Sequence, residues 1–148
     1  MTAMASILRI SDAAALALHT MAYLAASHPT RVPNRAIASS LHASEAHLSK
    51  VLQRLVRSGF VASIRGPHGG FVLARDPGDV RLIDVYEAIE GPLDSRTCLF
   101  GDAVCHSDSC VMGDVLSELY GRVNTYLTTT TLSDLAVSFD THDARGGD

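Results

Sequence analysis

The stretch SEAHLSKVLQRLVRSGFVASIRGPHGGFVLAR, residues 44–75, decides the fold. Apolar side chains recur in its first half at intervals of three and four residues, at Leu48, Val51, Leu52, Leu55 and Val56. This period predicts an amphipathic helix over residues 45–58. Ser44 is well suited to cap the start of that helix, and Gly59 supplies the left-handed residue that follows its end.

Two β-type runs follow the helix, FVASI at residues 60–64 and FVLA at residues 71–74. The turn-rich RGPHGG between them predicts a hairpin. Upstream, NRAIASSL at residues 34–41 predicts a short helix, which a tight break separates from the next one. Two short helices with a tight turn and an adjoining hairpin are typical of a winged helix-turn-helix. The expected fold class is mainly α with a small β-hairpin wing.

Three further helical stretches surround this module. Residues 12–27 predict a first helix that Asp12 caps, and residues 82–90 predict a short fourth helix. Residues 111–130 predict a long helix whose apolar stripe is close to a coiled-coil seam. The stripe consists of Met112, Val115, Leu116, Leu119, Val123, Tyr126 and Leu127. A final turn, LSDLAVSF, follows it.

These elements predict four regions. We expect a winged helix-turn-helix domain at residues 7–92 and a cysteine-bearing loop at residues 93–110. A long helix and the final turn then occupy residues 111–138, and residues 139–148 form a polar tail that we expect to be disordered.

The charge is segregated along the chain. The net charge is −4, yet residues 31–75 hold seven basic residues and one acid, Glu45. The remainder holds five basic and fifteen acidic residues. A basic segment beside an acidic remainder indicates a surface for a polyanion, although a solvated basic face has the same composition.

A helix that reads the major groove needs its apolar stripe on one side and hydrogen-bonding side chains on the other. The hairpin tip adds basic side chains that can reach a minor groove, whereas a winged helix used for protein contacts is the other interpretation. The residues predicted to contact double-stranded DNA are Ser44, Glu45, His47, Ser49, Lys50, Arg54, Arg65 and His68. Gln53, Arg54 and Arg57 lie further along the helix, where phosphate contact or simple solvation is expected.

Two classes of protein are not supported. No apolar run reaches the roughly 18 residues that a membrane span needs, and the Ala-rich N-terminus is interrupted by polar residues, unlike a signal peptide. We therefore expect a cytoplasmic protein without membrane contact. We also find no nucleophile paired with a base and no phosphate loop, so we do not expect an enzyme.

Cys98, Cys105 and Cys110 stand in CLFGDAVCHSDSC. Three cysteines cannot all pair within one chain, and a cytoplasmic protein keeps its thiols reduced. Clustered thiolates bind iron–sulfur clusters or zinc, usually with a fourth ligand. From the spacing alone, metal ligation, a redox-active pair and incidental cysteines all remain open.

The residues SEAHLSKVLQRLVRSGFVASIRGPHGGFVLARDPGDVRLIDVYEAIEGPL resemble the Rrf2 family of bacterial winged-helix regulators, which contains IscR and NsrR. The similarity runs from about residue 7 to residue 138, and RGPHGGFVLAR and DVYEAIEGPL are its most specific parts. It implies a homodimer that pairs through residues 111–130 and binds a palindromic operator. It also implies that Arg65 is the minor-groove arginine. The base-reading glutamate of IscR falls on Ser49, so the IscR target sequence does not carry over.

The same resemblance implies an iron–sulfur cluster, [2Fe-2S] or [4Fe-4S], on Cys98, Cys105 and Cys110. The histidine ligand of IscR falls on Gly113, which argues against IscR-type ligation. ISDAAALALHTMA resembles the NsrR segment that carries an aspartate ligand, and it places Asp12 at that position. Asp12 is therefore the candidate fourth ligand, donated from the partner subunit, and His106 is the alternative.

The predicted function is a DNA-binding transcriptional regulator, expected to act as a repressor, whose cluster senses nitric oxide, redox state or iron status. The alternative keeps the fold without the cluster. In that case the regulator senses a small molecule, or oxidation of its cysteine thiols.

Overall fold

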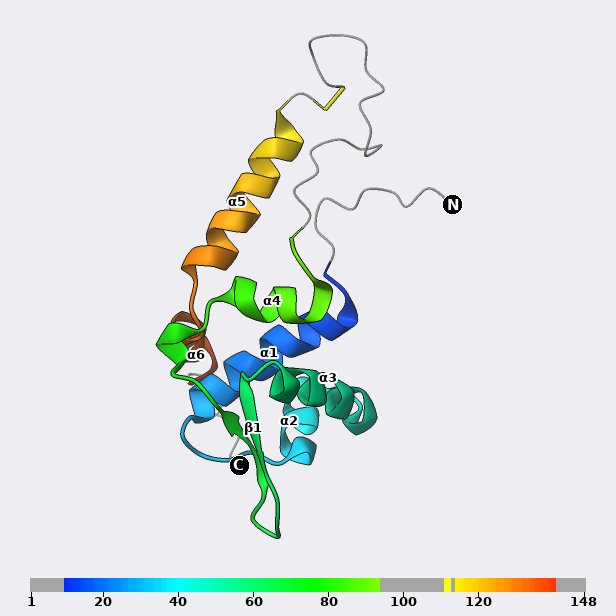
Figure 1. Ribbon diagram of the computed structural model, residues 1–148, viewed down its shortest axis with the longest axis vertical. Helices are drawn as coiled ribbons and strands as arrows, with labels where there is room; N and C mark the ends of the chain where they lie inside the picture. Colours follow the sequence, from blue (N-terminus) through cyan, green and yellow to red (C-terminus); the bar gives the residue numbers. More distant parts are fainter. Residues whose placement is uncertain (1–9, 94–110, 113, 141–148) are drawn as a thin grey trace, which may run out of the picture.

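The computed structural model describes residues 10–93, 111–112 and 114–140, and its long axis runs from the hairpin to the fifth helix (Figure 1). In chain order the elements are α1 (Asp12–Ser27), α2 (Asn34–Leu41), α3 (Glu45–Arg57), β1 (Val61–Ile64), β2 (Gly70–Leu73), the 3-10 turn η1 (Pro77–Asp79), α4 (Leu82–Glu90), α5 (Val115–Thr129) and α6 (Leu132–Asp140). The mainly α fold class with a two-stranded antiparallel wing is confirmed.

Helix α1 forms the centre of the core. Its inner face carries small side chains, and Ala14, Ala17 and Met21 are fully buried. Short side chains let other helices approach closely, and α1 packs against α3, α4 and α6. The Ala-rich N-terminal sequence is thus explained by a buried helix. No helix in the described ranges is long and apolar enough to cross a membrane.

The start of α1 differs from the expectation. Ser11 is the N-cap, with extended backbone, and its hydroxyl accepts a hydrogen bond from the Ala14 backbone N at 3.1 Å. The prediction that Asp12 caps the helix is wrong by one residue, because Ser11 also has a capping side chain. Asp12 instead occupies the first turn, where its carboxylate still interacts favourably with the helix dipole.

The hairpin is fixed to the body by a second pairing. β1 and β2 pair in antiparallel register from Val61–Leu73 to Ile64–Gly70. Phe71 also exchanges two backbone hydrogen bonds with Val32, at 2.8 and 2.9 Å, in the connector between α1 and α2. A Cβ on Gly70 would lie 2.7 Å from the Val32 carbonyl oxygen, so this close approach requires glycine.

The C-terminal helices depart from the predicted boundaries. α5 begins at Val115 rather than at residue 111, with Asp114 at its N-cap position, where the Asp114 side chain makes no capping hydrogen bond. The segment predicted as a final turn forms α6, which packs against α1 and extends through Asp140, two residues into the predicted tail. Residues 141–148 lie outside the described residues.

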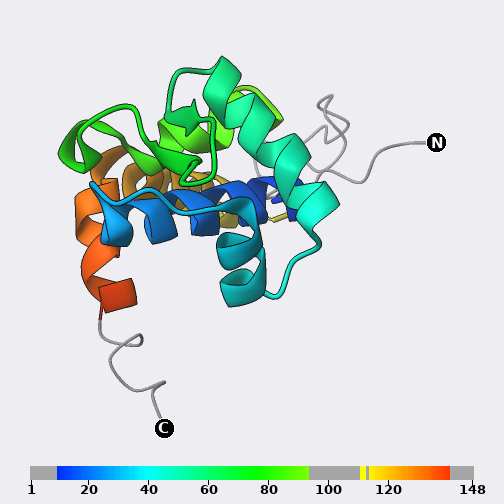
Figure 2. The ribbon, with the colours of Figure 1, turned by 90° about the horizontal axis from the view of Figure 1, so that it is seen from below.

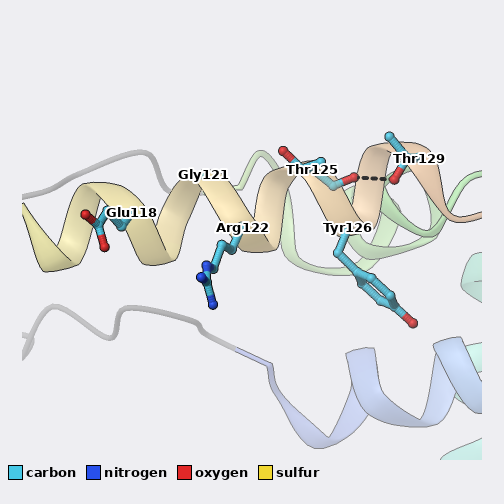
Figure 3. A pocket seen from close by; sticks show the side chains of 6 residues that line it. All are labelled: Glu118, Gly121, Arg122, Thr125, Tyr126 and Thr129. Carbon is cyan, nitrogen blue, oxygen red and sulfur yellow. Dashed lines mark hydrogen bonds between the residues drawn. The ribbon is translucent and has the colours of Figure 1, made fainter.

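The apolar stripe of α5 divides between two faces. Leu116 and Leu127 are buried, and Val123 packs against the core. Val115, Leu119 and Tyr126 are exposed, to 49%, 38% and 55%. Figure 3 shows Glu118, Arg122 and Tyr126 projecting from the same side of α5, along a shallow hollow.

Candidate nucleic-acid interface

Helix α3 presents a polar face to solvent. The Ser44 hydroxyl accepts a hydrogen bond from the His47 backbone N at 3.0 Å, which confirms the predicted cap. The predicted stripe faces inward, with Leu48, Val51, Leu52 and Leu55 buried and Val56 half-buried. The outward face is exposed and polar or basic, and consists of Glu45, His47, Lys50, Gln53, Arg54 and Arg57.

The first strand of the hairpin lies beside this helix. α3 and β1 are adjacent in the view down the short axis and in the view from the hairpin end (Figures 1 and 2). Arg65 and His68 are exposed in the loop that joins β1 to β2. The molecule therefore has a helix with cationic side chains next to a protruding loop that carries a further arginine.

Ser49 is half-buried, because Asn34 at the start of α2 covers one side of it and the other side stays open to solvent. The side-chain amide nitrogen of Asn34 donates a hydrogen bond to the Ser49 hydroxyl oxygen, and another to the Glu45 carbonyl oxygen at 3.3 Å. Asn34 was not predicted as a site residue. A polar residue after Pro33 is ordinary at the start of a helix, and its contact with α3 joins residues 15 positions apart.

Arg54 has a partner within the protein. Its guanidinium donates a hydrogen bond to the Ile89 carbonyl oxygen at 2.6 Å, at the C-terminal end of α4. This bond links α3 to α4. An Arg54 contact with a DNA phosphate, which stays a prediction, would have to share the same guanidinium.

The next residue of α4 holds the start of α1. The Glu90 carboxylate accepts a hydrogen bond from the Ser11 backbone N at 3.2 Å. We call this set the α4 junction: Ser11, Arg54, Ile89 and Glu90. Two consecutive residues of α4 thus bind α1 and α3, shortly before the segment that contains the cysteines.

Asp12 is exposed, and its side chain lines a hollow of about 490 Å³ between α1 and the turn that precedes α3. His19, His42 and His47 line the same hollow. Within the described ranges, no group of three or more His, Cys, Asp or Glu side chains is arranged to hold a metal ion. Cys98, Cys105, Cys110 and the alternative ligand His106 lie outside the described residues, as does Gly113.

Comparison with known proteins agrees with this fold. The Rrf2 family model, described as an iron-dependent transcriptional regulator, matches residues 10–138. A helix-turn-helix protein of Aquifex aeolicus is 30% identical over 128 residues, which cover 84% of this chain and 89% of that protein. The regulator IscR of an Enterobacter species is 28% identical over 115 residues, 78% of this chain and 71% of IscR.

Among solved structures, the chain is similar to CymR of B. subtilis, titled the global cysteine regulator of that organism. The TM-score is 0.74 and the identity 30%, over 88% of this chain and 98% of CymR. The family match covers most of the chain and agrees with the observed winged helix-turn-helix. The protein therefore belongs to the Rrf2 family of transcriptional regulators.

Proposed function

We propose that this protein binds a palindromic DNA operator as a homodimer, and that an iron–sulfur cluster controls its binding. The observation that carries the DNA-binding part is the exposed face of α3 with Lys50 and Arg57, next to a hairpin loop with Arg65. Cationic side chains on adjacent elements match the phosphate backbone on either side of a groove. Repression is the expected mode.

The homodimer is supported by α5. Val115, Leu119 and Tyr126 follow one another at spacings of four and seven residues, and Arg122 fills the intermediate position. Exposed apolar side chains at this spacing are typical of a helix that packs against another helix. A second copy of α5 is the occupant that we propose, since pairing would bring two α3 helices onto one operator.

The DNA contacts can be tested with Lys50→Ala and Arg65→Ala. Because both side chains are exposed, each change is expected to weaken DNA binding about tenfold and leave the melting temperature unchanged. Arg81→Ala is the control, because Arg81 forms an exposed ion pair with Asp84 on α4. Unchanged affinity of both variants for an operator selected with the wild-type protein would contradict the assignment.

For the cluster, the residues proposed as ligands are Cys98, Cys105 and Cys110 with Asp12 from the partner subunit. Thiolates with one carboxylate form a suitable donor set for iron. Asp12 fits this role, because its exposed carboxylate makes no hydrogen bond or ion pair with any described residue. When bound, the cluster would supply a centre that nitric oxide, oxygen or iron shortage can attack.

Two arrangements support a route from such a site to α3. Asp12 and His47 line one hollow, so a change at Asp12 acts next to the first turn of α3. At the α4 junction, Ile89 and Glu90 hold Arg54 and the start of α1. A shift in either place changes the orientation of α3 and thereby the population of dimers that fit DNA.

The cluster is tested by absorption and Mössbauer spectra of protein purified without oxygen, before and after exposure to nitric oxide. We expect cluster signals that nitric oxide abolishes, and loss of the bound iron in Cys105→Ser. Asp12→Ala should change the Mössbauer parameters of one iron site. A colourless, iron-free protein after reconstitution with iron and sulfide would exclude the cluster.

A cluster-free thiol sensor is the second candidate, favoured by the similarity to CymR, the global cysteine regulator. In that case two of the three cysteines form a disulfide on oxidation, with peroxide accepting the two electrons. Mass spectrometry of peroxide-treated protein would then show a Cys–Cys bond together with release of DNA. A cluster protein would lose iron under the same treatment.

A further inference from the structure

The amide of Asn34 connects the start of α2 to the recognition helix. Asn34 is the first residue of α2, and its side-chain oxygen accepts no hydrogen bond from a described residue there. Its amide nitrogen instead donates to the Ser49 hydroxyl oxygen and to the Glu45 carbonyl oxygen. The two acceptors are one turn apart on α3. The two bonds therefore hold the face of α3 that carries Ser49 against the start of α2.

The chemistry of these groups determines where the protons are. A backbone carbonyl only accepts hydrogen bonds, so the edge of the Asn34 side chain that faces Glu45 is its NH₂ edge. The same NH₂ edge faces Ser49, whose oxygen must therefore accept. The Ser49 hydroxyl keeps its own proton, and no acceptor in the described part of the chain takes it.

We propose that Asn34 is a positioning residue that sets the Ser49 hydroxyl as a hydrogen-bond donor, and that Ser49 thereby selects a base with an acceptor in the major groove. This inference rests on the proposed DNA binding. The acceptors on base edges there are purine N7, guanine O6 and thymine O4, whereas cytosine presents an amino donor. An unrestrained serine hydroxyl can rotate to donate or accept, so it distinguishes bases poorly without such a partner.

The arrangement is not the one that stability alone would favour. The side-chain oxygen of Asn34 is buried and has no hydrogen-bond partner among the described residues. An unpaired buried oxygen is unfavourable, and a shorter residue at this position would avoid it. The cost of this unpaired oxygen offsets part of what the two donated bonds contribute, so Asn34 variants should remain folded.

The test is selection from a randomised duplex DNA library, with base preference at each operator position as the readout. Wild-type protein is expected to prefer acceptor bases about tenfold at one position of each half-site, the size of one net hydrogen bond. Ser49→Ala should lose this preference at that position only. Asn34→Asp should reverse it toward cytosine, because a carboxylate accepts the Ser49 proton and leaves the hydroxyl oxygen to accept from the cytosine amino group.

Ser39→Ala and Ser39→Asp are matched controls, because Ser39 is exposed on the same helix. Ser39→Asp adds the same charge as Asn34→Asp, so it is expected to lower affinity for all sequences and leave the preference unchanged. Melting curves establish that each variant is folded, and Asn34→Ala provides a second variant, expected to lose the preference without reversal.

The possible failures are distinguishable. If the wild-type protein selects no operator, the proposed DNA binding is wrong. If it selects one, and folded Ser49→Ala selects the same bases at every position, DNA binding stands and Ser49 does not read a base. If Ser49→Ala loses the preference while Asn34→Ala and Asn34→Asp both retain that of the wild-type protein, the orienting role of Asn34 is overturned.

Discussion

At the scale of single residues, two arginines on α3 are expected to behave differently. Arg54 bonds to the Ile89 carbonyl oxygen, whereas Arg57, three residues later, is exposed. Arg54→Ala should lower the free energy of unfolding by about 1–2 kcal/mol, because a bond from a charged donor is lost. Arg57→Ala should change it by about 0.5 kcal/mol or less. Equal melting temperatures for the two variants would contradict the structural role of Arg54.

A second residue-scale prediction concerns acid. The hydrogen bond from the Arg81 side chain lowers the pKa of Asp84 below its ordinary value of 3.8, against the opposing effect of partial burial. A lowered pKa in the folded state stabilises the protein above the ordinary pKa, and this stability is lost as the pH falls through the folded value.

Asp84→Asn is therefore expected to be less stable than the wild-type protein at neutral pH. The difference should stay constant down to about pH 5 and shrink below about pH 4. Denaturation in urea across this range measures it. A difference that does not vary with pH would mean that the charge of Asp84 contributes nothing.

The partners of polar side chains were the part of the site that the sequence did not predict. Ser44 could be assigned as a cap because it bonds to a residue three positions away. The contacts of Asn34 with Ser49 and of Arg54 with Ile89 join residues 15 and 35 positions apart. They depend on how the helices pack, and periodicity does not report packing between particular helices.

At the scale of elements, the hairpin depends on Gly70 and its pairing with the connector. Gly70→Ala places a Cβ 2.7 Å from the Val32 carbonyl oxygen. It should lower the free energy of unfolding by about 1–3 kcal/mol, because the backbone must shift and weaken the Val32–Phe71 pairing. Gly121→Ala is the control on α5, where nothing lies within 4 Å of the added Cβ.

Gly121→Ala is expected to raise the free energy of unfolding by about 0.5–1 kcal/mol, since alanine favours a helix more than glycine does. Thermal melts of the two variants should therefore move in opposite directions. A Gly70→Ala protein as stable as the wild-type would show that the connector yields readily and that the hairpin does not depend on this approach.

The elements themselves were largely predictable from sequence. α1, α2 and α4 have the predicted bounds, because proline, glycine and capping residues mark their ends locally. The apolar stripe of residues 111–130 was predicted as a single seam, but the structure divides it between the body and solvent. A spacing of three and four residues identifies the apolar face of a helix. It does not show which element packs against each side chain on that face.

At the scale of the whole molecule, the exposed face of α5 should control assembly. Tyr126→Glu places a charge on a side chain that is 55% exposed in the single chain. If α5 pairs with α5, this variant should sediment as a monomer and bind a palindromic operator at least tenfold more weakly, because each half-site is then bound independently.

Val137→Glu is the matched control for assembly, because Val137 is an apolar and more exposed side chain on α6, at 69%. We expect it to remain dimeric. Dissociation of the dimer by Val137→Glu but not by Tyr126→Glu would assign the interface to α6 instead. A wild-type protein that is monomeric at all concentrations would exclude both.

The α4 junction has a consequence for the proposed sensing segment, residues 94–110, which on that proposal can be exchanged. Ile89 and Glu90 hold the recognition helix and the start of α1 through two hydrogen bonds, one from a side chain and one from the backbone. Both bonds are made by residues that precede Leu93 in the chain. On this proposal, a segment with different chemistry could replace residues 94–110. The same winged helix-turn-helix would then respond to a different signal.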